Sequence, residues 1–168
     1  MTKSRWLLEP GAGESVSLGG IGVHFKIFGR DTGGRFSIVE HPVAPRVLVP
    51  SHVHHNEDEY SYVVSGLIGV RVGDDIFDAR AGSYVLKPRE IPHTFWNPTD
   101  EPVLLVEIIA PAGFEQQFAE MGQWLRTGPI TPEFGAGLSR RYHIDNAPDT
   151  WNAWIRDLTK EHRLVPAG

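Results

Sequence analysis

The sequence lacks cysteine altogether, and this absence limits the chemistry available to the protein. Without thiols it forms neither disulfides nor thiolate ligands, so any metal site must use histidine, aspartate or glutamate. Basic residues are also few, with 16 Lys and Arg against 21 Asp and Glu and a formal net charge of −5. Because no cluster of Lys and Arg occurs, we expect neither nucleic acid nor an anionic membrane as a partner.

Long apolar runs are absent as well. The N-terminal region contains only Trp6-Leu7-Leu8, which is too short for the core of a signal peptide. No segment approaches the length that spans a membrane. We therefore expect a cytoplasmic protein. Its 168 residues are enough for one domain with a real hydrophobic core.

Short segments rich in β-branched and aromatic residues fill the region from about 20 to 112. They predict an extended piece at 45–50 and strands at 22–29, 35–43, 59–65, 67–72, 76–81, 83–86, 93–96 and 103–109. Short strands between turn residues are typical of an all-β sandwich or barrel. The residues before position 20 are expected to form an irregular arm.

The pattern changes after Pro111, where apolar residues recur at helical spacing. The two helical faces are Phe114, Phe118, Met121 and Leu125, and Trp151, Trp154, Ile155 and Leu158. Pro148 suits the first turn of the second helix. We expect both faces to pack on the barrel or on a partner subunit, because such stripes usually serve packing. The chain is thus interpreted as one domain, 1–168, with a β-barrel core at about 20–112 and a helical extension at 113–168.

A histidine-rich segment leads into one of the predicted strands. His52 and His54 are two residues apart, so on an extended strand their side chains share a face. Two adjacent imidazoles form half of a metal site. Glu59 follows five residues after the second of them, and His93 occurs later beside a proline.

These residues and their spacing resemble the two motifs of the cupin family. The first motif is matched by His52, His54, Glu59 and Gly66, and the second by Gly82, Pro88, His93 and Asn97. Arg46 and Glu90 stand where the motifs have glycine. The order of strands is also similar to bacterial single-domain cupins related to quercetin dioxygenases. The resemblance implies a double-stranded β-helix, or jelly-roll barrel, with C-terminal α-helices.

The resemblance also implies one bound divalent transition metal. Its ligands would be His52, His54, Glu59 and His93. Three imidazole nitrogens and one carboxylate suit Fe, Mn, Ni, Co, Cu or Zn, and an octahedral ion would keep two open positions. Three unrelated histidines are the alternative, which the spacing of Glu59 and His93 disfavours. Glu57 and Asp58 are expected in a solvated loop, although either could replace Glu59 as a ligand.

Strand parity predicts the walls of a pocket. We expect four residues to contact a substrate: Phe95, Asn97, Val63 and Phe36. The first two share a face with His93, and Val63 shares a face with Glu59. Ile38 is an alternative to Phe36, and Val63 fits a plain barrel core equally well. Mainly apolar walls suit an aromatic or otherwise apolar small molecule.

Three functions use the same residues. The first is a metal-dependent dioxygenase of a small phenolic or enol substrate, in which the resemblance makes Glu59 both ligand and catalytic base. The second is a small-molecule-binding or sensor cupin without turnover. The third is an isomerase or lyase that uses the metal as a Lewis acid. The sequence does not separate them, because a fold does not fix a function.

We also expect a homodimer. Four tryptophans are predicted outside the barrel, namely Trp96, Trp124, Trp151 and Trp154. A barrel with two helices would not cover them all, and large exposed apolar patches are uncommon on monomers.

Overall fold

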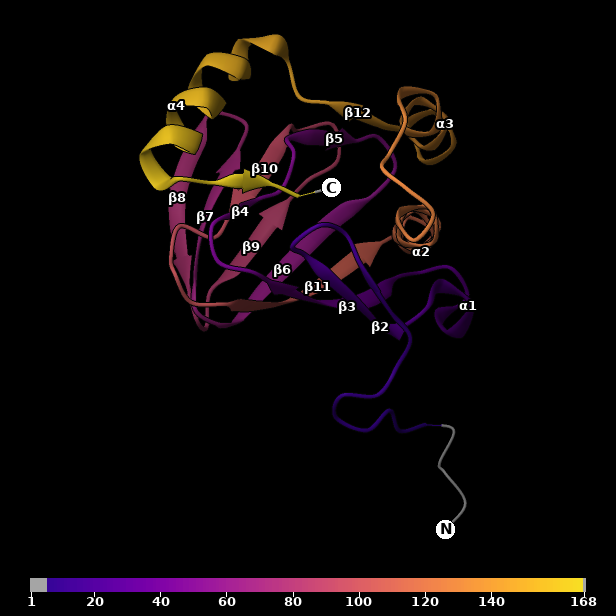
Figure 1. Cartoon of the computed structure of the whole chain (residues 1–168). Helices are drawn as coiled ribbons and strands as arrows, with labels where there is room; N and C mark the ends of the chain where they lie inside the picture. The colour runs from indigo at the N-terminus through magenta and orange to yellow at the C-terminus, as the bar shows by residue number, and fades with distance from the viewer. Residues whose placement is uncertain (1–5, 168) are drawn as a thin grey trace.

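The computed structural model describes residues 6–167 and consists mainly of two β-sheets (Figure 1). Across the first sheet lie β1 (Ser15–Ser17), β2 (Gly22–Ile27), β3 (Ser37–Val43), β11 (Val103–Ala110), β6 (Asp58–Ser65) and β9 (Tyr84–Lys87). Across the second lie β12 (Ile144–Asn146), β5 (His52–His54), β10 (His93–Trp96), β4 (Val47–Leu48) and β13 (Val165–Pro166). In the same sheet β7 (Leu67–Val72) pairs with β10 and with β8 (Asp75–Arg80).

The main hydrophobic core is formed by the inner faces of the strands. On β3 every second residue is buried, from Ser37 to Val43, which is the pattern of a strand with one face inside. Val39 and Leu105, on the paired strands β3 and β11, are both fully buried. The predicted all-β fold with C-terminal helices is confirmed.

The helices are short and follow the strands, except for α1. They are α1 (Gly29–Thr32), α2 (Glu115–Leu125), α3 (Pro132–Tyr142), the 3₁₀ turn η1 (Asp149–Trp151) and α4 (Asn152–His162). Two of them fall where helices were predicted, whereas α3 was not predicted. In Figure 1, α2 and α3 lie together on one side of the barrel and α4 lies on another. No helix of residues 6–167 is long and apolar enough to cross a membrane.

The C-terminal extension returns to the barrel and is not purely helical. β12 pairs with β5, the strand that carries two of the predicted metal ligands, and β13 pairs with β4. β1 likewise lies before the predicted start of the barrel and pairs with β2. The segment after α2 therefore helps to position the functional strand.

Two of the tryptophans predicted outside the barrel are covered by other parts of the chain. Trp96 and Trp151 are only 3 % and 5 % exposed, and Trp154 packs edge-on against both of them. The guanidinium of Arg71 lies 3.8 Å above the Trp151 ring, which further fastens η1 and α4 to the barrel. The homodimer stays a prediction, and these side chains no longer motivate it.

Candidate metal centre

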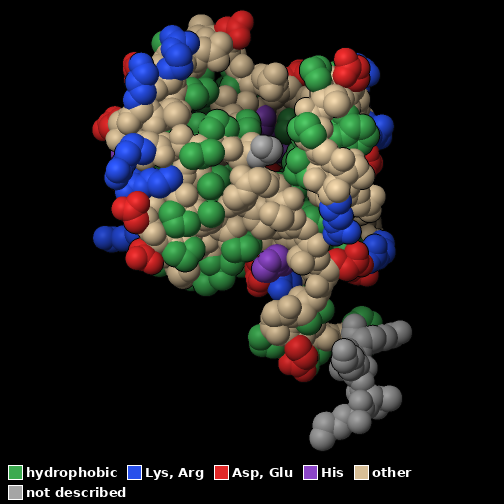
Figure 2. Space-filling model, viewed as in Figure 1, with side chains coloured by type: hydrophobic (Ala, Val, Ile, Leu, Met, Phe, Trp, Pro, Cys, Tyr) green, Lys and Arg blue, Asp and Glu red, His purple; other side chains and the backbone are tan. Residues whose placement is uncertain are grey.

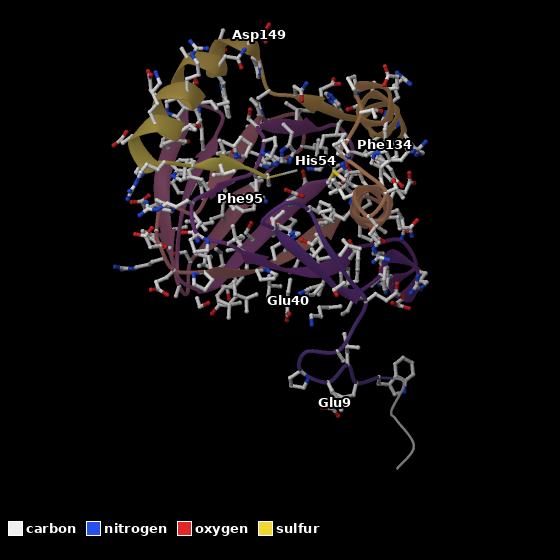
Figure 3. The ribbon with its side chains drawn as sticks, viewed as in Figure 1. Glu9, Glu40, His54, Phe95, Phe134 and Asp149 are labelled. Atoms are coloured by element: carbon white, nitrogen blue, oxygen red, sulfur yellow. The ribbon has the colours of Figure 1, made fainter. Side chains whose placement is uncertain are left out.

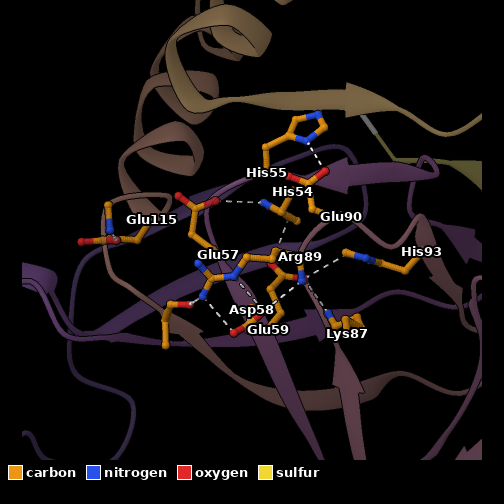
Figure 4. Close-up of polar contacts among 12 residues, drawn as sticks. His54, His55, Glu57, Asp58, Glu59, Lys87, Arg89, Glu90, His93 and Glu115 are labelled. Carbon is orange, nitrogen blue, oxygen red and sulfur yellow. Dashed lines mark hydrogen bonds and ion pairs between the residues drawn. The ribbon is translucent and has the colours of Figure 1, made fainter.

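The four predicted ligands converge from both sheets. His52 and His54 lie on β5, and His93 lies on β10 directly opposite His52. Glu59 comes from β6 in the other sheet, so only the folded barrel brings the four together. One potential ligand atom from each residue lies within 4.8 Å of all the others. Figure 3 shows His54 in the interior, and Figure 4 shows it close to Glu59.

Backbone carbonyls orient two of the three imidazoles. Nδ1 of His52 lies 2.7 Å from the carbonyl oxygen of Pro50, and Nδ1 of His93 lies 3.1 Å from that of Ile91. Because a carbonyl oxygen can only accept, each Nδ1 donates its proton there. Each Nε2 therefore keeps its lone pair, which is the form that a metal requires.

The buried nitrogen atoms of this cluster fit a metal ion. Nε2 of His54 and of His93 are buried and have no hydrogen-bond partner among the described residues. They lie 3.4 Å and 3.3 Å from oxygens of Glu59, but without the geometry of a hydrogen bond. Burial lowers the pKa of His93, which keeps its ring neutral. Three imidazoles facing one carboxylate suit a divalent transition metal.

A buried ion-pair network lies next to Glu59. Nζ of Lys87 is 2.8 Å from one oxygen of Glu59 and 2.9 Å from an oxygen of Glu107. Ser61 donates its hydroxyl to Glu107 at 2.9 Å. All four side chains are at most 5 % exposed. One buried cation is thus shared by two buried carboxylates.

This network sets the protonation of its members. Burial raises the pKa of Glu59, but Lys87 and the imidazoles of His54 and His93 outweigh it and hold that pKa well below its usual value. Burial, aided by the charge of Glu59, raises the pKa of Glu107 to about 7 against the opposing effect of Lys87. The two carboxylates outweigh burial and raise the pKa of Lys87. Near neutral pH, Glu107 is the carboxyl that can hold a proton.

The sequence analysis missed Lys87 and Glu107, although one signal was available. Glu107 interrupts the apolar strand β11 at a position whose neighbours two residues away, Leu105 and Ile109, are fully buried. A lone charge at a core position needs a partner of opposite charge. The partner is Lys87 on β9, which is opposite Glu59 in the sheet register.

A cavity of about 740 Å³ adjoins the cluster. His52 and Glu59 are the two predicted ligands that line it, so it reaches the metal centre from their side. Its apolar walls include Val49, Phe95, Phe114, Phe118, Met121 and Ile130. In Figure 2 hydrophobic side chains border a hollow in this face of the molecule. The α2 residues among them were expected only to pack, and here they also line the cavity.

Of the four residues predicted to contact a substrate, one lines the cavity and three do not. Phe95 lines the cavity, whereas Val63, Asn97 and Phe36 are not among its lining residues. Val63 belongs to the hydrophobic core. The amide nitrogen of Asn97 donates to the carbonyl oxygen of Glu101 at 2.7 Å, so this side chain braces the loop after β10. A substrate contact stays a prediction for all four residues, and of these Phe95 lines the cavity.

The loop before β6 corrects another expectation. Glu57 was expected to be solvated, but it is only 6 % exposed and faces His54. Asp58 points elsewhere and pairs with Arg89 at 2.9 Å. His55 lies at the surface between two carboxylates, those of Glu90 and Asp145.

Comparison with known proteins agrees with this geometry. Residues 41–109 match the family model of the cupin domain. The matched region includes both motifs, all four predicted metal ligands, Lys87 and Glu107. No curated protein is significantly similar to the chain in sequence.

Solved structures show the same fold at low identity. An RmlC-like cupin from Shewanella frigidimarina is 20 % identical over 69 % of this chain and 99 % of its own, with a TM-score of 0.57. A predicted oxalate decarboxylase from Thermotoga maritima is 12 % identical over 62 % of this chain and 98 % of its own, with a TM-score of 0.59. A sugar phosphate isomerase of the cupin superfamily from Silicibacter pomeroyi is 18 % identical over 62 % of this chain and 74 % of its own, with a TM-score of 0.54. These similarities establish the cupin fold and leave the reaction open.

Proposed function

We propose that this cupin is a metal-dependent oxygenase of a small, neutral, mainly apolar substrate that carries a phenolic or enolic hydroxyl. The observation that carries the proposal is the apolar cavity beside His52 and Glu59. Its volume of about 740 Å³ is in the range of small-molecule sites. The aromatic rings of Phe95, Phe114 and Phe118 offer surfaces on which a planar ring can stack.

The charges around the cavity favour a neutral substrate. Among the described residues that line it, Lys87 and Arg140 are the cations. Lys87 is already bonded to Glu59 and Glu107, and Arg140 is exposed to solvent. Apart from the metal, a small dianion such as oxalate would therefore find no free buried cation. The phosphate of a sugar phosphate would meet the same difficulty.

The residues divide the work as follows. His52, His54, His93 and Glu59 would hold a divalent transition ion, which supplies Lewis acidity and open coordination positions for oxygen ligands. Glu59 would take the proton of the substrate hydroxyl as that oxygen arrives. Lys87 opposes this step, because its charge stabilises the ionised form of Glu59. Glu107 offsets part of this effect of Lys87. When Glu59 becomes neutral, Lys87 still has an ion pair with Glu107.

Two other functions remain alternatives. An isomerase or lyase would use the same ligands and the same base without consuming oxygen, and a sensor would bind the ligand without turnover. The apolar cavity suits a binding protein as well as an oxygenase. Oxygen consumption separates the oxygenase from the other two, and conversion of a substrate separates the isomerase or lyase from the sensor.

The direct test is oxygen uptake with flavonols and catechols. The protein would be reconstituted separately with iron, manganese, nickel and cobalt, and each form assayed with an oxygen electrode. We expect uptake with at least one metal, and loss of turnover in Glu59→Gln with part of its metal retained, since the amide cannot accept the proton. Tight binding of a phenol without oxygen uptake in any form would favour the sensor. Conversion of a substrate without oxygen would favour the isomerase or lyase.

A further inference from the structure

The side chain of Glu57 is unusual for a residue in a connecting loop. It lies between β5 and β6 and is 6 % exposed, whereas its neighbour Asp58 turns outward to Arg89. Its oxygen Oε2 is buried and has no hydrogen-bond partner among residues 6–167. A buried carboxylate without a donor is costly, so its position calls for an explanation.

The nearest polar group to this oxygen belongs to a metal ligand. Nδ1 of His54 lies 3.5 Å from Oε2 of Glu57, and this nitrogen is itself buried without a hydrogen-bond partner in the described chain. Figure 4 shows the carboxylate of Glu57 pointing at the His54 ring. A small tightening of this distance would satisfy both atoms with one hydrogen bond. Phe114 packs edge-on against the same ring, with centroids 4.2 Å apart, so the imidazole is held by both contacts.

This arrangement sets His54 apart from the other two histidines. Nδ1 of His52 and of His93 faces a neutral backbone carbonyl, as described above. Only His54, of the three, has an ionisable carboxylate at that position. A carboxylate that accepts the Nδ1 proton makes the imidazole more basic at Nε2, because negative charge is drawn toward the ring.

We propose that Glu57 is a positioning residue that orients His54 and strengthens it as a metal ligand. The inference rests on the metal centre proposed above, and it extends that centre by a fifth residue, which lies in the spacer of the first motif and is not one of the motif's anchor positions. Glu57 does not bind the ion itself. Nδ1 and Nε2 point away from each other on the imidazole ring, so a carboxylate at Nδ1 lies on the far side from an ion at Nε2.

Titration of the metal-free protein with Co²⁺ tests the proposal without any need for turnover. The measurements are the Kd, obtained in competition with a chromophoric chelator, and the visible absorption of the bound cobalt. We expect Glu57→Ala to bind Co²⁺ about 10–100-fold more weakly than the wild type. The Kd of Glu57→Gln should lie between those of the wild type and Glu57→Ala, because the amide oxygen still accepts the Nδ1 proton but carries no charge. Its cobalt absorption bands should also shift.

Asp58→Asn is the matched control, because it removes the neighbouring charge, which pairs with Arg89 on the outer side. It should leave both the Kd and the cobalt spectrum unchanged. Thermal unfolding of each metal-free variant shows whether the fold is intact, and the nearly isosteric Glu57→Gln carries the test if Glu57→Ala does not fold.

Three results would overturn the proposal. In the first, Glu57→Ala and Glu57→Gln bind Co²⁺ with the same Kd as Asp58→Asn. Glu57 would then be a purely structural residue, even if both variants were less stable. Another is a Glu59→Ala variant that keeps full Co²⁺ affinity while Glu57→Ala loses it, which would make Glu57 the ligand. Absence of cobalt binding by the wild type would remove the metal centre itself. If the variants change the cobalt affinity and spectrum as expected but the wild type takes up no oxygen, only the proposed oxygenase activity is contradicted.

Discussion

The ammonium of Lys87 lies 2.8 Å from Oε2 of Glu59 and occupies one of the two oxygens of this predicted metal ligand. The same ammonium lies 2.9 Å from Glu107. Lys87 therefore does two things at once: it fixes the direction of the Glu59 carboxylate, and it neutralises a second carboxylate in the barrel interior. The centre is consequently a network that extends beyond four ligands, and its charge balance depends on one lysine.

Replacing Lys87 by methionine should destabilise the protein strongly. The change leaves Glu59 and Glu107 buried without their common cation, and removing one partner of a buried ion pair costs about 3–5 kcal/mol. The measurement is the free energy of unfolding of the metal-free protein by urea denaturation.

The charge-balanced control is Lys87→Met combined with Glu107→Gln. The double variant should recover part of the lost stability, because only one buried carboxylate then lacks a partner. Arg89→Met, which breaks the exposed pair with Asp58, should change stability little. A single Lys87→Met variant as stable as the wild type would show that the network does not support the fold.

Removal of two histidines from different strands should abolish metal binding. His52→Ala with His93→Ala leaves one imidazole and one carboxylate, which cannot hold an ion tightly. Elemental analysis should find one divalent ion per wild-type chain and none in the double variant. His24→Ala, which changes a partly exposed histidine on β2, serves as the control and should keep its metal. Equal metal content in all three proteins would refute the ligand assignment.

The positions of most strands and the proximity of the four candidate ligands were predictable from the sequence. His52 and His54 share a face by strand periodicity, and that face is fixed as soon as β5 pairs with β10. Glu59 and His93 could be added through the motif spacing alone. Lys87 and Glu107, which form the network beside Glu59, come together only in the folded barrel. Their burial can be inferred from the sequence, but their pairing cannot.

Two positions where the cupin motifs have glycine carry other residues in this chain, and each of these residues pairs with a residue distant in the sequence. Arg46 and Glu90 stand at glycine positions and still adopt left-handed backbone, with φ of 60° and 64°. Each position is held by partners elsewhere: Arg46 by an ion pair with Asp100 at 2.8 Å, and Glu90 by His55.

Helix α3 was missed for a different reason. Gly135 and Gly137 lower its helix propensity, and no long apolar stripe marks it. Its start was nevertheless visible, since the Thr131 side chain caps Phe134 and Pro132 occupies the first turn. Tertiary contact then stabilises it, chiefly the stacking of Phe134 on Trp124 at 4.0 Å.

His41 should make stability depend on pH between about 6.5 and 4. It is 3 % exposed, and burial lowers its pKa from 6.5 to about 4, although Nδ1 donates to the carbonyl oxygen of Gly22. Lys87 and His24 lower the pKa further, and Glu59 raises it. Between the two values the unfolded chain binds more protons than the folded one. The contribution of His41 is therefore fully present above pH 6.5 and is lost as the pH falls toward 4.

His41→Asn tests this dependence, because the asparagine amide can still donate to Gly22. Urea denaturation of the metal-free wild type and variant should give free energies that converge as the pH falls from 7 to 4. The full shift corresponds to roughly 3 kcal/mol. Parallel curves over this range would mean that His41 titrates normally.

The homodimer remains a prediction, with a different surface as its basis. Tyr84 is 82 % exposed and Leu86 is 53 % exposed on β9, beside Tyr60 at 42 % on β6. We expect light scattering at micromolar concentration to give about twice the chain mass of 18.7 kDa. Tyr84→Ser with Leu86→Ser should shift the mass toward the monomer. A wild-type mass near 18.7 kDa would contradict the dimer.

A pair of fluorescent probes can test the preference of the cavity for neutral ligands. N-phenyl-1-naphthylamine and 8-anilino-1-naphthalenesulfonate share one aromatic skeleton, and only the second carries a sulfonate. The cavity has apolar walls, and its buried cation Lys87 is already paired, so the neutral probe should bind more tightly. Fluorescence titration of the metal-free protein measures both affinities, which keeps the metal from attracting the anion.

A larger side chain at Ala136 should then show where the probe binds. Ala136 lies on α3 and lines the cavity, so a larger side chain there can take up part of that space. Ala136→Phe should weaken binding of the neutral probe while leaving Co²⁺ affinity unchanged, because α3 carries none of the metal ligands. Ala153→Phe, on α4 and outside the cavity, is the control and should bind the probe as the wild type does. Tighter binding of the sulfonate, or equal effects of the two substitutions, would contradict a neutral ligand in this cavity.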